Sequence, residues 1–147
     1  MAFKHIVVAT DFSEQSNRAL DVCRQLASRD DAKVSLVHAF PNIFYGVQGV
    51  PAAPLAPSKE QLAEMKRLTE ASLERLRGEH LEGVPFVHVH LLPCESPSNA
   101  IADFAKEKGA DLIIVGSHGR SGLAKLLVGS VAEQVVRLAE CPVLVAR

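Results

Sequence analysis

Short apolar runs alternate along the chain with amphipathic stretches. Apolar runs with little polar alternation are typical of parallel strands that are covered on both faces. Such runs predict strands at residues 5–9, 33–40, 84–92, 111–115 and 141–146. Between them, apolar residues recur at the spacing of amphipathic helices. These stretches predict helices at residues 13–29, 58–77 and 96–108 and from residue 130 onward. The alternation predicts an α/β protein.

The order of these elements restricts the fold. Strands that alternate with helices form parallel sheets with right-handed crossovers and helices on both faces. A chain of 147 residues suits one domain, so we expect a single Rossmann-like open parallel sheet of five strands. Pro85 favours an edge position for the third strand, because proline cannot donate a ladder hydrogen bond. In such sheets, ligands bind beyond the carboxyl ends of the strands, where the strand order reverses.

The predicted second helix carries an apolar stripe between two boundary signals. Ser58 and Gln61 have the spacing of a capping box, and Gly78 is predicted to end the helix. The stripe consists of Leu62, Met65, Leu68, Thr69, Ser72, Leu73 and Leu76. A stripe at this spacing is more typical of a helix face packed on the core than of a partner-binding surface.

Residues 41–57 differ from the rest of the chain. They are rich in proline and glycine and follow neither a helical nor a strand period. We expect a flexible loop here. A long loop in a compact domain is either a lid over a site or an excursion without a role, and the sequence leaves both alternatives open.

A glycine-rich loop follows the strand predicted at residues 111–115. Its glycines are Gly116, Gly119, Gly122 and Gly129. They match neither the dinucleotide pattern G-x-G-x-x-G nor the P-loop pattern G-x-x-x-x-G-K-[ST]. A glycine loop that leads into a helix N-terminus is still a good anion site, because backbone N–H groups and the helix dipole point at the same place. We therefore favour phosphate binding over a merely tight connection.

The helix after this loop has its own signals. Ser130 is the expected N-cap. The residues expected on the inner face are Val131, Val135 and Leu138.

The spacing within the loop resembles the nucleotide-binding motif of the universal stress protein family. Gly116-x-x-Gly119 is followed by nine residues and then by Gly129-Ser130. The similarity extends to Ser117-His118-Gly119-Arg120 and to the closing strand after Cys141-Pro142, and it covers the whole chain. The resemblance implies the strand order 3-2-1-4-5, ATP as ligand, and homodimers that form through the C-terminal strand.

The strand order places the first and fourth strands side by side, so Ala9, Thr10 and Asp11 should lie beside the glycine loop. The resemblance implies that Asp11 lies by the ribose, although an aspartate here is also a plausible helix N-cap. It also implies that the backbone at Ala39 meets the adenine edge. The full set of predicted nucleotide-binding residues is Ala9, Thr10, Asp11, Ala39, Gly116, Ser117, His118, Gly119, Arg120, Gly129, Ser130 and Val131.

Arg120 and Ser130 are candidates to neutralise and bind phosphate, whereas the alternative for Arg120 is a solvated loop charge. A Mg²⁺ ion, if present, would be held mainly by phosphates and water. His88 and His90 share one face of the third strand, but a metal site would need further ligands. A solvent-facing pair is the favoured interpretation.

Composition and charge exclude other function classes. Lys and Arg total 16 against 17 for Asp and Glu, which gives no electrostatic footprint for nucleic acid or membranes. No apolar run is long enough to span a bilayer. The N-terminus has no signal-peptide pattern, so a cytoplasmic protein is expected. The 3 cysteines form no metal or redox motif and are expected to be reduced.

No nucleophile–base pair with a recognisable motif is present. The sequence therefore predicts a stress-response protein that acts by binding ATP rather than by dedicated catalysis. Two alternatives stay open. One is a slow ATPase or phosphotransferase that uses the same pocket, and the other is a nucleotide-free interaction protein with unknown protein partners.

Overall fold

The computed structural model describes residues 2–41, 57–117 and 128–147. Strands and helices alternate strictly within these residues. In chain order they are β1 (His5–Ala9), α1 (Glu14–Asp30), β2 (Lys33–Pro41), α2 (Lys59–His80), β3 (Val87–Cys94), α3 (Pro97–Glu107), β4 (Leu112–Gly116), α4 (Ser130–Leu138) and β5 (Val143–Ala146). Residues 42–56, most of the predicted loop, lie outside the described residues.

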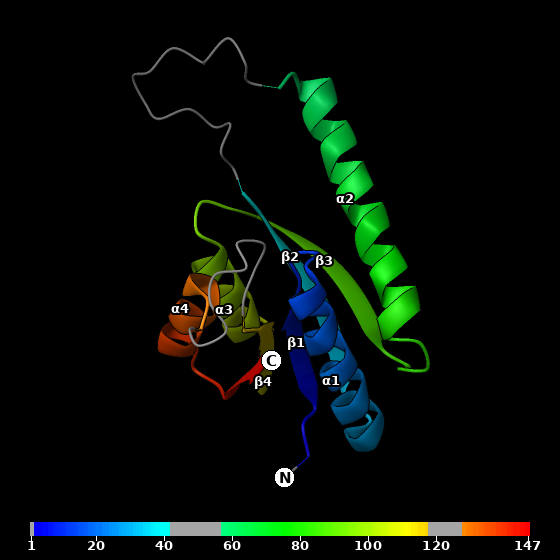
Figure 1. Cartoon of the computed structure of the whole chain (residues 1–147), viewed down its shortest axis with the longest axis vertical. Coiled ribbons are helices and arrows are strands. Elements are labelled where there is room, and N and C mark those ends of the chain that lie inside the picture. Colours follow the sequence, from blue (N-terminus) through cyan, green and yellow to red (C-terminus); the bar gives the residue numbers. More distant parts are fainter. Residues whose placement is uncertain (1, 42–56, 118–127) are drawn as a thin grey trace.

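The strands form one parallel sheet in the order β3-β2-β1-β4-β5 (Figure 1). The predicted strand order and the edge position of β3 are confirmed. The order reverses between β1 and β4, which are direct neighbours. The switch point therefore lies at the carboxyl ends of these two strands.

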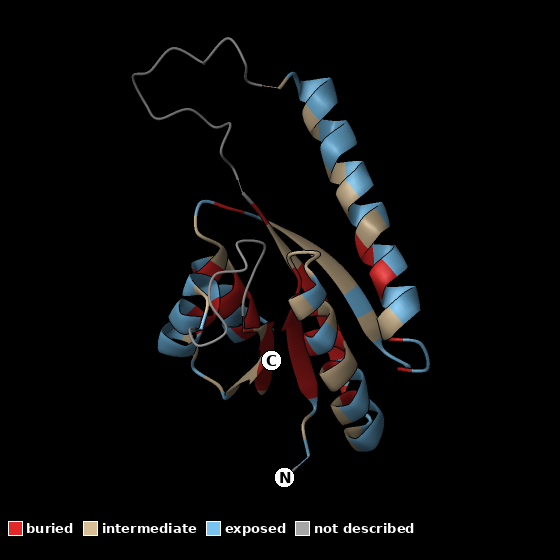
Figure 2. Ribbon diagram, in the orientation of Figure 1, coloured by how far each residue is buried: buried red, intermediate tan, exposed pale blue. Residues whose placement is uncertain are grey.

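Each face of the sheet is covered by two helices. Alternate side chains of one strand point to opposite faces, so Ile6 and Val8 of β1 pack with residues of α1 and α2. Val7 and Ala9 pack on the other face with residues of α3 and α4. Burial concentrates in the central strands, as Figure 2 shows for β1. The predicted α/β class, with helices on both faces, is confirmed.

The end of α2 differs from the prediction. The capping box at Ser58 and Gln61 is present, but the helix continues through Gly78 to His80. The continuation is anchored because His80 Nδ1 lies 2.9 Å from an Asp21 carboxylate oxygen on α1, and the next residue, Leu81, is buried in the core. The left-handed residue that turns the chain is Gly83, with φ 84°. Tertiary anchoring, rather than the first glycine, sets the helix end.

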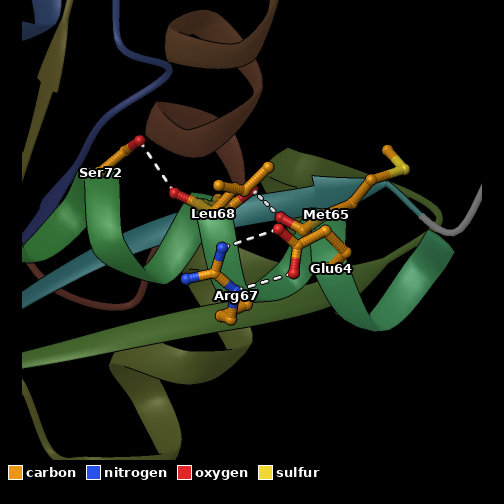
Figure 3. A network of polar contacts seen from close by, with 6 residues as sticks. Glu64, Met65, Arg67, Leu68 and Ser72 are labelled. Carbon is orange, nitrogen blue, oxygen red and sulfur yellow. Dashed lines mark hydrogen bonds and ion pairs between the residues drawn. The ribbon is translucent and has the colours of Figure 1, made fainter. Parts of the chain in front are cut away.

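The apolar stripe of α2 is only partly core. Leu73 and Leu76 are buried, whereas Met65 and Leu68 are 39% and 51% exposed. The amino-terminal half of α2 projects beyond the sheet (Figure 1), so it has little to pack against there. This half is stabilised locally by an ion pair between Glu64 and Arg67 on the same helix (Figure 3). The prediction that the whole stripe faces the core is wrong for Met65 and Leu68.

The boundaries of α4 and β3 also differ from the predictions. Gly129, not Ser130, is the N-cap of α4, because Ser130 already has helical geometry. Of the predicted inner residues, Val135 is buried but Val131 and Leu138 are 40% and 47% exposed. The short helix buries a narrow face made of Ala132 and Val135. β3 begins only at Val87, after Pro85.

Polar side chains at the amino-terminal edge of the sheet are bonded within the protein. The Asp111 carboxylate accepts the N–H groups of Lys4 and His5. The His5 ring lies 2.9 Å from Ser35 Oγ and 3.2 Å from the Lys108 carbonyl. Burial, helped by the nearby Lys33 charge, lowers the pKa of His5 below its usual value. This hydrogen-bonded cluster serves the fold.

Among the described residues, no helix combines the length and the apolar character needed to cross a bilayer.

Candidate functional site

The ends of β1 and β4 meet at the switch point. Val8 pairs with Ile114, so Thr10 and Asp11, which follow β1, lie at the same edge of the sheet as the end of β4 at Gly116 and Ser117. Two buried strands thus deliver a carboxylate and a glycine turn to one place. This placement was predicted from the sequence.

The turn after β1 is held by a closed set of hydrogen bonds. Phe12 N–H donates to Thr10 Oγ1 at 3.0 Å, and Ser13 N–H donates to an Asp11 carboxylate oxygen at 3.0 Å. Ser13 is the N-cap of α1 and accepts the Ser16 N–H. The alternative interpretation of Asp11 as the helix N-cap is therefore wrong. Asp11 lies two residues before this cap, just beyond the carboxyl end of β1.

The hydroxyl protons of this turn can be assigned by counting. Ser16 Oγ donates to the Ser13 carbonyl at 2.7 Å, which uses its single proton. The Thr10 hydroxyl, 2.9 Å from Ser16 Oγ, must then be the donor of that bond. Because Thr10 Oγ1 also accepts the Phe12 N–H, the Thr10 side chain serves the turn. Any contact between Thr10 and a ligand is therefore expected to come from its backbone rather than from its hydroxyl.

A histidine that the sequence analysis did not single out lies beside this turn. His38 of β2 places Nδ1 at 2.8 Å from the Thr10 carbonyl oxygen, and its ring centroid lies 4.7 Å from that of Phe12. The signal was a polar residue inside the apolar run at residues 33–40. The sequence did not show that the His38 side chain reaches the Thr10 carbonyl, so that signal had no interpretation.

Gly116 has a packing role of its own. A β-carbon at this position would lie 3.1 Å from the Gln15 carbonyl carbon and oxygen and 3.2 Å from Ser16 N. The first turn of α1 therefore packs directly on the end of β4, and any side chain at Gly116 would push it away. This contact keeps the α1 N-terminus and the β4 end at a fixed separation.

Two backbone bonds bring α4 to the same edge. Ser117 N–H donates to the Ala146 carbonyl of β5 at 2.7 Å, and Gly129 N–H donates to the Ser117 carbonyl at 2.6 Å. The second bond closes the glycine loop and places the N-terminus of α4 against the end of β4. In the described residues no side chain caps α4, and Ser130 and Val131 at its first turn are exposed. The predicted residues His118, Gly119 and Arg120 lie outside the described residues.

Histidine and cysteine side chains form no metal centre in the part of the chain that is described, where no cluster of three or more metal-binding side chains occurs. His88 is exposed on edge strand β3, but His90 is half-buried with its ring 4.8 Å from that of Phe104. Burial lowers the pKa of His90 below its usual value. His90 therefore packs on α3, which the interpretation as a solvent-facing pair did not include.

Comparison with known proteins decides the family. The model of the universal stress protein family matches residues 2–147. The chain belongs to the universal stress protein family. Among curated relatives of this family, universal stress protein YxiE from Bacillus subtilis is 33% identical over 149 residues, which cover 99% of both chains.

Solved structures of universal stress proteins share the fold. UspA from Lactobacillus plantarum has a TM-score of 0.81 at 25% identity and covers 100% of this chain and 99% of its own. The universal stress protein from Archaeoglobus fulgidus in complex with dAMP has a TM-score of 0.66 at 27% identity, with 100% of both chains covered. The family resemblance stated from the glycine motif is thus confirmed, and at least one structural relative binds an adenine nucleotide.

Proposed function

We propose that this universal stress protein binds ATP at the carboxyl ends of β1 and β4. It acts as a nucleotide-dependent stress-response or regulatory protein, by binding rather than by dedicated catalysis. The observation that carries the proposal is the convergence of three features at the switch point: the Asp11 turn, the Gly116 end of β4 and the N-terminus of α4.

The phosphates are assigned to the N-terminus of α4. A helix N-terminus offers unpaired N–H groups and a positive dipole end to an anion. The α4 N-cap is a glycine with no capping side chain in the described residues, so the N–H groups of the first turn are not consumed by a cap. Ser130 and Val131 would contribute here, together with His118, Gly119 and Arg120, on the family motif alone.

The nucleoside is assigned to the β1–β2 side. Asp11 would accept a hydrogen bond from a ribose hydroxyl, because each oxygen of a carboxylate can accept more than one hydrogen bond. Ala9 and Thr10 would line the same edge through their backbone. The adenine would meet the backbone of Ala39, which is half-buried near the end of β2.

The direction of the Ala39 backbone groups supports this assignment. Thr10 N–H donates to the Val37 carbonyl at 3.0 Å, so Val37 turns its backbone groups toward β1. In a parallel ladder the direction alternates with each residue, so Ala39 also turns its N–H and carbonyl to that side. There β1 has already left the sheet. The edge of an adenine could therefore pair with the Ala39 backbone groups where the next residue of β1 would otherwise lie.

The nucleotide class is supported by the Archaeoglobus fulgidus relative in complex with dAMP. Mg²⁺, when bound with ATP, would be coordinated mainly by phosphates and water. Calorimetric titration of the purified protein with ATP and magnesium, and with GTP for comparison, tests the proposal. Mass spectrometry of any ligand released from the purified protein tests it independently. No ATP binding in the titration, together with no adenine nucleotide among the released ligands, would favour the nucleotide-free interaction protein.

Hydrolysis of the bound ATP should be slow. Efficient hydrolysis needs a positioned water, a group that orients it, and charge stabilisation at the γ-phosphate. The α4 N-terminus and Arg120 could supply the charge stabilisation, but the nearest water-orienting candidates, Glu133 and Gln134, lie a turn into α4. Gln134 also accepts a hydrogen bond from buried Ser98 at 2.6 Å. We expect single-turnover hydrolysis to take minutes or longer, whereas rates near the ~10 s⁻¹ typical of enzymes would support the ATPase alternative.

The protein is expected to form homodimers through β5. β5 is an edge strand, and β4 covers only one of its sides. The Pro142 and Ala146 carbonyls accept hydrogen bonds from Ile113 N–H of β4 and from Ser117 N–H just after it. By alternation, Val143 and Val145 therefore turn their backbone groups outward. An antiparallel strand from a second copy would pair with these groups and close a two-fold assembly.

Val143→Pro tests this dimer, because it removes an outward N–H without removing a bond to β4. Sedimentation of the wild type at micromolar concentration should show a dimer, and Val143→Pro should shift it toward monomer. Val143→Thr keeps the N–H and a β-branched side chain and serves as the control. A wild-type monomer, or a dimer that Val143→Pro leaves intact, would contradict the expectation.

A further inference from the structure

We propose that His38 is a positioning residue of the nucleotide site. It holds the β1–α1 turn so that the Asp11 carboxylate and the Ala39 backbone both face the ligand. The inference rests on the proposed nucleotide binding and adds a residue to it that the family motif in the glycine loop does not contain.

The hydrogen bond from His38 to Thr10 has a defined direction. Nδ1 lies 2.8 Å from the Thr10 carbonyl oxygen. A carbonyl oxygen can only accept, so Nδ1 must carry the proton and donate. His38 follows Val34 and Leu36 on the same face of β2, the face covered by α1 and α2. The imidazole therefore holds the Thr10 carbonyl from that face of the sheet.

This bond ends the ladder between β1 and β2. The last rung is the bond from Thr10 N–H to the Val37 carbonyl. In a parallel ladder the next rung would run from Ala39 N–H to the Thr10 carbonyl. Among the described residues that rung is not made, and the Thr10 carbonyl accepts from His38 instead. The side chain of one β2 residue thus replaces the rung that the next residue would make, and the Ala39 N–H is left for a ligand.

His38 also contacts the other side of Asp11. Phe12 has φ 65°, a left-handed conformation that is strained for a bulky residue. It is kept there by its N–H bond to Thr10 Oγ1 and by packing of its ring on the His38 ring. The two ring centroids are 4.7 Å apart, and the ring planes meet at 49°. Asp11 lies between the two residues that His38 holds. Such a contact fixes the carboxylate before the ligand arrives, which reduces the ordering cost of binding.

The rest of the structure does not depend on this contact. α1 has its own cap at Ser13, and its first turn is bonded through Ser16. The rung from Thr10 N–H to Val37 stays available without the imidazole. Loss of His38 should therefore disturb the turn and leave the sheet and α1 folded.

Two substitutions separate the hydrogen bond from the ring contact. His38→Phe keeps a ring against Phe12 but removes the donor. His38→Asn removes the ring but keeps an amide N–H that can reach the Thr10 carbonyl. Calorimetric titration with ATP and magnesium should show binding weakened about tenfold in His38→Phe, the effect expected when a buried carbonyl loses its donor. His38→Asn should recover most of that loss.

The matched control is His90→Phe. His90 also packs a half-buried ring on a phenylalanine, Phe104; the ring centroids are 4.8 Å apart and the ring planes meet at 55°. His90 belongs to β3, however, and its ring lies on the opposite face of the sheet. The same substitution there should leave ATP affinity at the wild-type value. Equal weakening in both variants would show a general loss of stability and overturn the positioning role.

A double-mutant cycle tests whether His38 acts through Asp11. If it does, adding His38→Phe to Asp11→Ala should weaken binding by much less than it does in the wild type. Full additivity would overturn the proposal. A wild type that binds no nucleotide would refute the proposed function instead.

A measurement without ligand tests the positioning role in that case. The Ser13 N–H bond to Asp11 reports the turn. Its amide hydrogen should exchange about tenfold faster in His38→Phe, while amides of β4 and those in His90→Phe exchange as in the wild type. Unchanged exchange at Ser13 would overturn the inference whatever the nucleotide result.

Discussion

Replacement of Gly129 by aspartate should abolish ATP binding and leave the protein folded. Gly129 is the N-cap of α4, with φ −62° and ψ 153°, a conformation open to any residue. Aspartate is among the preferred N-cap residues, and its carboxylate accepts the N–H group of the second or the third helical residue. In this chain those N–H groups belong to Val131 and Ala132. The substitution would therefore satisfy the helix with a donor that the phosphates need.

The expected size of this effect follows from two losses. A hydrogen bond to a charged group contributes about 1.5–3 kcal/mol, and one such donor would be consumed by the cap. The new carboxylate would also repel the polyphosphate at short range. Loss of affinity by at least about 100-fold is expected, with a melting temperature at or slightly above that of the wild type.

Calorimetric titration and thermal unfolding of the same samples measure the two properties. Gly129→Asn is the matched control, because asparagine caps a helix as well as aspartate does but adds no charge. It should bind ATP with an affinity between those of the wild type and Gly129→Asp. If Gly129→Asp bound ATP as tightly as the wild type, the phosphates would have to bind elsewhere and the proposed site would be wrong.

The sheet could be predicted because its signals are local. β1 and β4 are short apolar runs with nothing polar between their ends, as expected for strands covered on both faces. Their lengths and the helices between them allow few parallel arrangements. Which strands are neighbours came from the family motif, since apolar periodicity does not show it. The position of Asp11 at the switch point followed from that strand order.

Interactions between elements account for the errors. The sequence could not show that α2 projects past the sheet, so Met65 and Leu68 had the same pattern as buried Leu73. Gly78 was a reasonable helix stop, but the contact between His80 and Asp21 extends α2 beyond it. In each case the outcome depends on where a distant part of the chain lies. Periodicity identifies the apolar face of a helix and says nothing about how far the body beneath it reaches.

In the candidate site, too, the features with local signals were predicted and those that depend on distant contacts were not. Glycine spacing identified the loop, and the strand end identified Asp11, because both signals lie within a few residues. His38 was missed because its role depends on a side-chain contact with the Thr10 carbonyl, 28 residues earlier in the chain, which no local pattern indicates. The sequence left Asp11 open as the cap of α1, and only the bond from Ser16 N–H to Ser13 Oγ shows that Ser13 is the cap.

A pair of leucine substitutions on α2 should show how little of the stripe supports the fold. Leu73 is 0% exposed and belongs to the core cluster that joins α1, α2 and the sheet. Leu73→Ala removes buried methyl groups and leaves a cavity, which typically lowers the free energy of unfolding by about 2–5 kcal/mol. Leu68 lies five residues earlier on the same helix and is 51% exposed. Leu68→Ala should change the free energy of unfolding by less than about 0.5 kcal/mol.

Urea denaturation of both variants, at two protein concentrations, measures these changes. The two substitutions remove the same atoms from the same helix, so intrinsic helix propensity contributes equally to both. Their difference therefore reports burial alone. A large cost for Leu68→Ala would mean that Met65 and Leu68 are covered in solution. Dependence of that cost on protein concentration would identify the cover as a second copy of the chain, since association with another chain stabilises by mass action. A cost independent of concentration would place a segment of the same chain over the exposed half of α2.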